Sequence, residues 1–167
     1  MKVYLGTDHA GFDLKEKVKM HLEEKGYEVV DCGAHEFDKE DDYPDFIGKA
    51  AEAVSKDPQS FGIVLGGSGQ GEAIVANKIP GVRCALFYAL AVPPGAMDAS
   101  GKTSTDPYEM LRLTRAHNDS NMLSLGARFL TEEQSIQAVD TFLEAPFSGE
   151  QRHVRRIHKV AAIEQRK

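Results

Sequence analysis

The sequence lacks the features that mark secreted, membrane-bound and zinc-binding proteins. Its two cysteines, Cys32 and Cys84, are isolated, so they form neither a disulfide framework nor the paired spacing of a zinc site. No apolar run is long enough to span a bilayer, and the start of the chain does not resemble a signal peptide. We therefore expect a protein of the reducing cytoplasm, with no membrane partner.

Positive charge is also scarce. Lysine and arginine number 20 against 26 acidic residues, which gives a net charge of −6. This balance argues against a nucleic-acid surface, so we expect no nucleic-acid partner. The 167 residues, 41% hydrophobic and 28% charged, fit one globular domain over residues 1–167.

A glycine-rich loop is the most informative stretch. The apolar run Ile63–Leu65 is typical of a buried strand, and Gly66-Gly-Ser-Gly-Gln-Gly-Glu72 follows it, with a helix expected from about Gln70. Such a loop can gather backbone N–H groups around an anion, whether a phosphate, a carboxylate or the oxyanion of an enediolate. Glu72 adds a negative charge, which suits a base that removes a C–H proton better than a loop that only grips phosphate.

Two nucleotide-binding motifs fit this loop poorly. A Walker loop needs a lysine directly after its last glycine, and a dinucleotide fingerprint needs Gly-x-Gly-x-x-Gly with an acid about 20 residues later. The chain has neither a lysine after Gly71 nor an acid in the region 86–90. A purely structural alternative stays open, in which Glu72 complements the dipole of a helix start after a tight turn.

Strands and helices alternate along the chain. Gly26 is placed to end the first helix, Asp106 to cap the fourth, and Thr131 with Gln134 to form a capping box. Expected strands cover 3–5, 27–30, 63–65, 82–87 and 122–125, and expected helices cover 12–25, 42–57, 70–79, 106–118, 131–143 and, as a basic C-terminal helix, 150–166. This alternation predicts a three-layer, Rossmann-like α/β fold with a five-stranded parallel sheet and helices on both faces.

Unusual polar residues follow the strands. Asp8 and His9, the loop from Ser68 to Glu72, and Arg128 all come directly after a strand. Ligands of parallel sheets bind outside the carboxyl ends of the strands. We therefore expect these side chains to lie together at that edge.

Several blocks, taken together and in order, resemble the ribose-5-phosphate isomerase B family, a group that also holds allose- and galactose-6-phosphate isomerases. The resemblance covers nearly the whole chain except about 89–105, which is predicted to be an inserted loop. The blocks are Gly6-Thr-Asp-His-Ala-Gly-Phe12, Asp42-Tyr-Pro44, Gly66–Glu72, Ala76-Asn-Lys78, His117-Asn118, Gly126-Ala-Arg128 and Gln151-Arg-His-Val-Arg-Arg156.

The resemblance implies an aldose–ketose isomerase that works through an enediol, without metal or other cofactor, on a phosphorylated sugar. One branch of the family carries a cysteine base at the position of Gly66, and this chain resembles the other branch, with Glu72 as base. The site would be shared across a homodimer, or a tetramer built from it. The implied roles are catalysis by Glu72, Ser68, Asp8 and the partner's His117, oxyanion binding by the Gly67, Gly69 and Gly71 amides, sugar binding by Asn118, and phosphate binding by His9, Arg128, Arg152 and Arg156.

Simpler interpretations remain for single residues. Asp8 could cap the first helix, His117 could complement a helix dipole, and Tyr43 fits a sugar pocket or ordinary packing equally well. Arg155 could replace Arg156, because both lie on one basic helical face with Arg152. The expected substrate is ribose 5-phosphate. The alternatives are allose or galactose 6-phosphate, or a sugar-phosphate-binding protein without catalysis.

Overall fold

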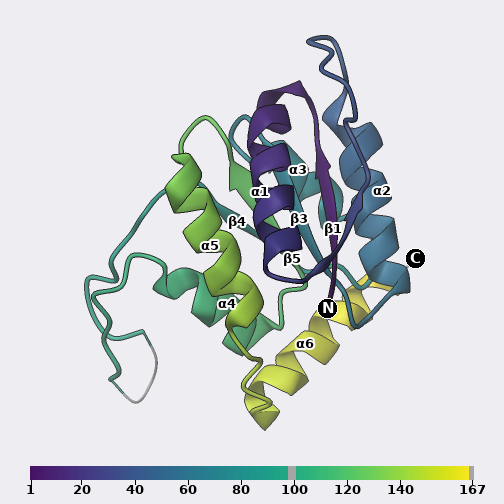
Figure 1. Cartoon of the computed structure of the whole chain (residues 1–167). Helices are drawn as coiled ribbons and strands as arrows, with labels where there is room; N and C mark the ends of the chain where they lie inside the picture. Colours follow the sequence, from purple (N-terminus) through teal and green to yellow (C-terminus); the bar gives the residue numbers. More distant parts are fainter. Residues whose placement is uncertain (98–100, 166–167) are drawn as a thin grey trace.

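A parallel five-stranded sheet forms the centre of the protein, as the sequence predicts (Figure 1). The computed structural model describes residues 1–97 and 101–165. The strands run in the order β2-β1-β3-β5-β4. Their bounds are Lys2–Thr7 for β1, Glu28–Asp31 for β2, Phe61–Gly66 for β3, Cys84–Phe87 for β4 and Met122–Gly126 for β5.

Helices cover both faces of the sheet, which confirms the predicted three-layer fold. One face carries α1 (Phe12–Glu24), α4 (Glu109–Asn118) and α5 (Glu132–Glu144). The other face carries α2 (Tyr43–Lys56) and α3 (Gln70–Ala76). The last helix, α6 (Gln151–Glu164), lies at the bottom of Figure 1, and a short 3₁₀ helix, η1 (His9–Gly11), follows β1.

Alternate residues of the central strand β3 supply two separate cores. Ile63 and Leu65 pack with α1 and α5, and Val64 packs on the other face with α2 and α3. All three side chains are fully buried. Burial on both faces explains why this strand is a continuous apolar run rather than an alternating one.

Helix ends follow the predicted signals in most places. Gly26 has a φ of +83°, and Thr131 and Gln134 form the capping box. The start of α4 differs, because Asp106 accepts hydrogen bonds from the N–H groups of Tyr108 and Glu109 in a turn that precedes the helix. The helix therefore begins at Glu109, later than predicted.

The remaining differences are short. β4 begins at Cys84 rather than at residue 82, and α3 ends at Ala76 rather than near residue 79. The expected end of the last helix, Arg166, lies outside the described residues. The segment predicted as an insertion, 89–105, forms neither helix nor strand in its described residues, 89–97 and 101–105.

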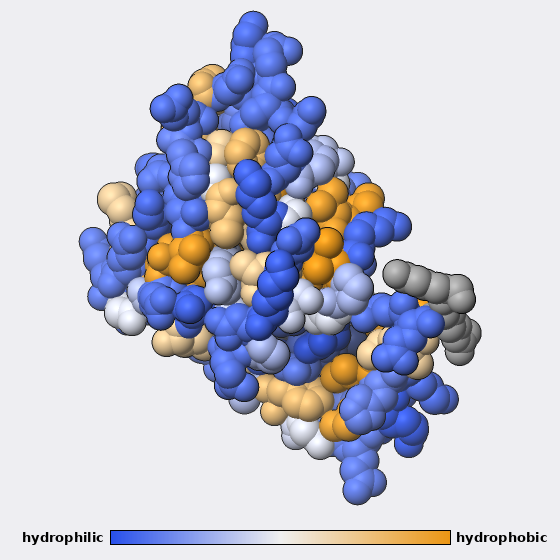
Figure 2. Space-filling view, turned by 90° about the vertical axis from the view of Figure 1, so that its right-hand side faces the viewer, coloured by the Kyte–Doolittle hydropathy of each residue, from blue (hydrophilic) through white to orange (hydrophobic). Residues whose placement is uncertain are grey.

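The surface is mainly hydrophilic on the side that Figure 2 shows, with hydrophobic side chains in separate patches in its middle and lower parts. Within residues 1–97 and 101–165, no helix has the length and apolar character needed to cross a bilayer. The apolar residues are instead concentrated in the two cores beside the sheet.

Candidate active site

The end of β1 places Asp8 at the carboxyl edge of the sheet. Thr7 Oγ1 donates a hydrogen bond to the carbonyl of Leu65 at 2.8 Å, which ties the ends of β1 and β3 together. Asp8 is 6% exposed, and its Oδ1 accepts a hydrogen bond from the N–H of Ala10 at 2.9 Å. Capping therefore uses one carboxylate oxygen and leaves Oδ2 for other contacts.

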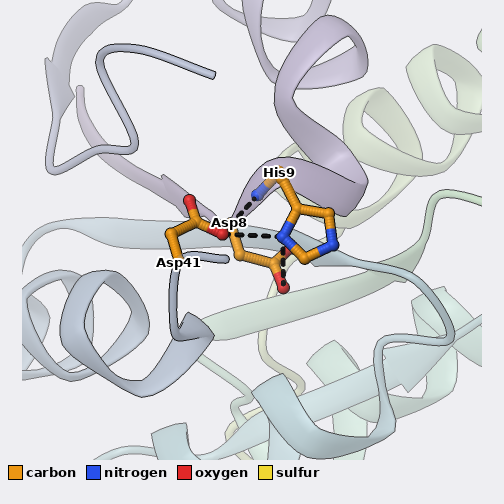
Figure 3. A group of neighbouring side chains, drawn as sticks. All are labelled: Asp8, His9 and Asp41. Atoms are coloured by element: carbon orange, nitrogen blue, oxygen red, sulfur yellow. Dashed lines mark hydrogen bonds and ion pairs between the residues drawn. The ribbon is translucent and has the colours of Figure 1, made fainter. Parts of the chain in front are cut away.

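His9 is held by a residue that the sequence did not single out. Oδ1 of Asp41 accepts hydrogen bonds from the His9 backbone N–H at 3.0 Å and from Nδ1 at 2.7 Å (Figure 3). Oδ2 of Asp8 lies 4.0 Å from the same ring nitrogen. Asp41 comes from the segment 32–42, which links β2 to α2.

Asp8, His9 and Asp41 could also hold a cation. Their candidate ligand atoms all lie within 4.8 Å of one another, and among the described residues this is the group that meets that distance. However, Nδ1 of His9 already makes a short hydrogen bond to Asp41. A metal at Nδ1 would have to break that bond, so the group is better suited to a direct carboxylate–imidazole contact.

The glycine loop brings backbone very close to its neighbours. Gly69 has a φ of +75°, which favours glycine, and a side chain at Gly71 would meet the ring of Tyr43 at 2.9 Å. The first hydrogen bond of α3 runs from the N–H of Ala73 to the carbonyl of Gly69. The N–H groups before Ala73 thus precede the helical ladder, and those of Gln70 and Glu72 bond instead to Ser68 Oγ and to the carboxylate of Glu72.

Glu72 lies folded back against the start of this loop. Its side chain is almost fully buried, and its carboxylate occupies the space where a Cβ on Gly66 would stand. Burial raises the pKa of Glu72 above its ordinary value. A hydrogen bond from the residue's own backbone N–H lowers this pKa in part, and the nearby charge of Asp8 raises it. The group is therefore a stronger base than an exposed glutamate.

Arg128 stands beside the same loop. The N–H groups of Ala127 and Arg128 donate to the carbonyls of Gly66 and Gly67 at 2.8 and 3.0 Å. A Cβ on Gly67 would lie 3.5 Å from Nη1 of Arg128, so the guanidinium group covers this glycine. Its charge also acts on His9, whose pKa it lowers.

Ser68 is turned towards the start of α3. Its Oγ accepts a long hydrogen bond, 3.4 Å, from the N–H of Gln70. The side chain is half-buried. A weak bond of this kind leaves the hydroxyl able to turn towards a ligand above the loop.

The other predicted residues lie at the opposite edge of the sheet. His117 and Asn118 end α4, just before β5 begins, and the carbonyl of Asn118 accepts a hydrogen bond from Nε of Arg83, just before β4. A five-residue strand separates this edge from Gly126, a distance of roughly 15 Å at 3.3 Å per residue. His117 packs its ring on that of His153 of α6, at 4.3 Å between centroids.

Arg152 and Arg156 belong to α6, at that same edge. Glu164 near the end of this helix accepts a hydrogen bond from the N–H of Gly81, which precedes β4. Arg152 is paired with Glu150 at 2.8 Å. Asn118 and Arg156 line a groove of about 510 Å³ whose walls include Ile157 and Val160.

One chain therefore brings together only part of the predicted set. The residues gathered at the carboxyl edge are Asp8, His9, Tyr43, Gly67, Ser68, Gly69, Gly71, Glu72 and Arg128. The residues at the amino edge are His117, Asn118, Arg152 and Arg156. Asp41 was missed because the acidic segment 36–42 offers several carboxylates and no signal for the one that folds back.

Comparisons with known proteins show which family the chain resembles. A family model described as Ribose/Galactose Isomerase matches residues 3–92 and 103–160. The gap between the two matched ranges falls within the segment predicted as an insertion, 89–105. Ribose-5-phosphate isomerase B of Mycolicibacterium paratuberculosis is 43% identical over 164 residues, covering 98% of this chain and 92% of that protein.

Two further relatives extend the likeness. The protein of the same name from Escherichia coli K12 is 35% identical over 166 residues, covering 99% of this chain and 98% of that protein. The crystal structure of ribose-5-phosphate isomerase B from Mycoplasma genitalium, with bound ribulose-5-phosphate, has a TM-score of 0.85 at 35% identity, covering 99% of this chain and 97% of that one.

Proposed function

Because the chain belongs to the ribose/galactose isomerase family, we propose that it interconverts ribose 5-phosphate and ribulose 5-phosphate with Glu72 as its base. The enzyme is an aldose–ketose isomerase. The observation that carries the proposal is the buried carboxylate of Glu72, beside a glycine loop and within the influence of Asp8. A buried base next to backbone donors suits the removal of a proton from carbon.

The reaction moves one proton between neighbouring carbons. Glu72 takes the proton from C2 of the open-chain aldose, the C–H electron pair forms the C1–C2 double bond, and the carbonyl oxygen gains the negative charge. In this proposal the N–H groups of Gly67, Gly69 and Gly71 bind that oxyanion, and each such donor is typically worth about 3 kcal/mol. Glu72 then returns the proton to C1, and a shift between the oxygens, assisted by Ser68, gives the ketose.

In this proposal His9 and Arg128 of the same chain bind the phosphate, since Arg128 covers Gly67 of the glycine loop and is close enough to His9 for its charge to act on the imidazole. Arginine offers forked donors to phosphate oxygens, and a protonated histidine adds one more. Asn118, Arg152 and Arg156 cannot reach this phosphate within one chain, because they lie at the other edge of the sheet.

A second copy of the chain supplies the missing half in this proposal. His117 would then oppose Asp8 and open the sugar ring, which needs a proton moved from the anomeric hydroxyl to the ring oxygen. Exposed apolar side chains support such a contact: Ile74 of α3 is 62% exposed, and Val160 and Ile163 of α6 are 50% and 61% exposed. A homodimer would cover apolar surface that a monomer leaves in water.

The steps above use only side chains and backbone groups of the protein, so we propose a reaction without a cofactor. We also propose a cytoplasmic location. Both cysteines are free. They are far apart across the sheet, because Cys32 follows β2 and Cys84 lies in β4, and these are the two outermost strands. Burial raises the pKa of the Cys84 thiol to about 12, which suits a thiol that stays reduced.

Turnover measured side by side on ribose 5-phosphate, allose 6-phosphate and galactose 6-phosphate tests the proposal, and ribose 5-phosphate should give the highest kcat/KM. Glu72→Gln should lower kcat by about 10²- to 10⁴-fold, the worth of a general base, while 5-phosphoribonate still binds. Full turnover in this variant would remove Glu72 from the mechanism. Binding without turnover in the unmodified protein would instead indicate a sugar-phosphate-binding protein.

A further inference from the structure

Asp41 is anchored to His9 by two hydrogen bonds to the same oxygen. Its Oδ1 lies 3.0 Å from the backbone nitrogen and 2.7 Å from Nδ1 of His9. Dashed lines mark both contacts in Figure 3. The Asp41 side chain is only 9% exposed. Neither bond is part of a helix or strand ladder, so the contact links the segment 32–42 directly to the residue that follows Asp8.

The two bonds settle which ring nitrogen faces the ligand. An ionised carboxylate only accepts hydrogen bonds, so Nδ1 of His9 must carry the proton. The ring cannot turn over without losing the 2.7 Å bond, and the backbone bond holds the base of the same side chain. Nε2 is therefore the nitrogen left for a ligand, and about a quarter of the side chain is exposed.

The charges around His9 favour its protonated form. The hydrogen bond from Asp41 raises the pKa of His9 above its ordinary value of 6.5, burial lowers it, and the charge of Asp8 raises it. Arg128 lowers it. Phe37, packed edge-on against the imidazole at 6.4 Å, adds no charge. The net shift is upward, so His9 keeps its proton to higher pH than an unperturbed histidine.

We infer that Asp41 is a positioning residue, which locks His9 with Nδ1 protonated and directs a cationic Nε2–H at the phosphate of the substrate. The inference rests on the proposed function, in which His9 binds that phosphate. A phosphate dianion then receives a charge-assisted hydrogen bond from His9 on one side and the forked donors of Arg128 on the other. Asp41 touches no reacting atom, and its effect passes through the imidazole.

The test compares Asp41→Asn with Asp42→Asn. The first variant keeps the shape of the side chain but removes its charge, while Asp42 is the exposed neighbour, whose side chain makes no capping bond to α2. Asp41→Asn should raise KM for ribose 5-phosphate and the inhibition constant of inorganic phosphate by the same factor, about tenfold. Its kcat should change little, and Asp42→Asn should match the unmodified protein.

The pH dependence separates this role from a merely structural one. In the unmodified protein, KM should rise with pH as His9 loses its proton, and in Asp41→Asn that rise should begin at lower pH. In a His9→Gln background, Asp41→Asn should add nothing further to KM. The inference would be overturned if Asp41→Asn raised KM as much in the His9→Gln background as in the unmodified protein. A fall in kcat at constant KM would overturn it as well.

Nuclear magnetic resonance of the unmodified protein tests the same point without a variant. The ¹⁵N signals of His9 should show Nδ1 protonated throughout, and added inorganic phosphate should shift the Nε2 signal. A ring protonated only on Nε2, or one that ignores phosphate, would contradict the role of Asp41. Turnover of ribose 5-phosphate by the unmodified protein tests the proposed function separately. The inference about Asp41 depends instead on the ratio of KM values between variants and on which nitrogen of the His9 imidazole is protonated.

Discussion

Gly66 and Glu72 share a space that admits only one side chain. A Cβ built on Gly66 would lie 1.8 Å from Oε1 and 2.0 Å from Cδ of Glu72. Glu72 is 5% exposed, so its carboxylate has little room to move aside. In this geometry a cysteine at position 66, as expected in the other branch of the family, is incompatible with the carboxylate where it stands.

Gly66→Ala should therefore displace Glu72 and lower kcat by about 10²- to 10⁴-fold, the range of general-base catalysis. The fold should survive, because the clash involves the end of a side chain and Gly66 has no positive φ. Steady-state turnover and a thermal melt of the same sample check both statements. Gly48→Ala, where an added Cβ meets nothing within 4 Å, is the matched control and should keep full activity.

The pH–rate profile should report the buried state of Glu72. The base must be ionised, so kcat/KM falls as the pH drops through the pKa of Glu72 in the free enzyme. Burial raises that pKa from its ordinary value of 4.5, with a further rise from Asp8. The acid limb should therefore lie above pH 4.5, and a limb at or below that value would mean that another group is the base.

The sequence predicted which candidate residues gather at the carboxyl ends of the strands. Asp8, Ser68 and Arg128 could be grouped in advance, because residues that follow parallel strands meet at one edge. Asp41 could not be, because the path of its segment is set by tertiary bonds. The N–H of Thr7 donates to the carbonyl of Gly33 at 2.8 Å, and the N–H of Ala34 donates to the carbonyl of Thr7 at 2.7 Å.

Contacts between side chains were the other feature beyond the reach of the sequence. The spacing of Gly66 and Glu72 does not show that one fills the place of the other's missing Cβ. Likewise, Asp106 has the residue type of a cap, yet its hydrogen bonds form a turn before α4. Local signals fix the type and order of elements, while their exact ends depend on how the chain packs.

Lys15 is fully buried and should be important for stability. Its ammonium group donates to Oδ2 of Asp31 and to the carbonyl of Ala34, both at 2.7 Å. Burial alone would raise the pKa of Asp31, but the hydrogen bonds from Lys15 and from the Gly33 N–H lower it overall. A lowered carboxyl pKa stabilises the fold above the unfolded-state pKa, and this contribution is lost as the pH falls through the folded-state value.

Lys15→Met should lower the free energy of unfolding at pH 7 by about 3 kcal/mol, because it removes the nearest cation from Asp31 and leaves Lys19 at 3.4 Å and His35 at 4.0 Å. The deficit should shrink in acid, where Asp31 takes up a proton. Urea denaturation across this pH range measures both effects. Lys17→Met, which breaks an exposed pair with Glu132, should cost about 0–1 kcal/mol, and an equal loss in both variants would contradict the prediction.

Mixing two inactive variants should restore activity if the site is shared between chains. Glu72→Gln damages the half at the carboxyl edge, and His117→Ala damages the half at the amino edge. In a mixed dimer one site carries both changes and the other carries neither. Refolding equal amounts together should therefore recover about a quarter of the unmodified turnover, since half of the dimers are mixed and each has one intact site of two.

The matched control mixes Glu72→Gln with Asp8→Asn, because both changes fall on the same half. Every site of that mixed dimer carries one damaged residue, so the mixture should stay as inactive as its components. Recovery in the first mixture alone is what a shared site requires. If neither mixture regains turnover although the chains exchange, His117 and Glu72 do not meet across an interface, and ring opening must depend on residues at the carboxyl edge.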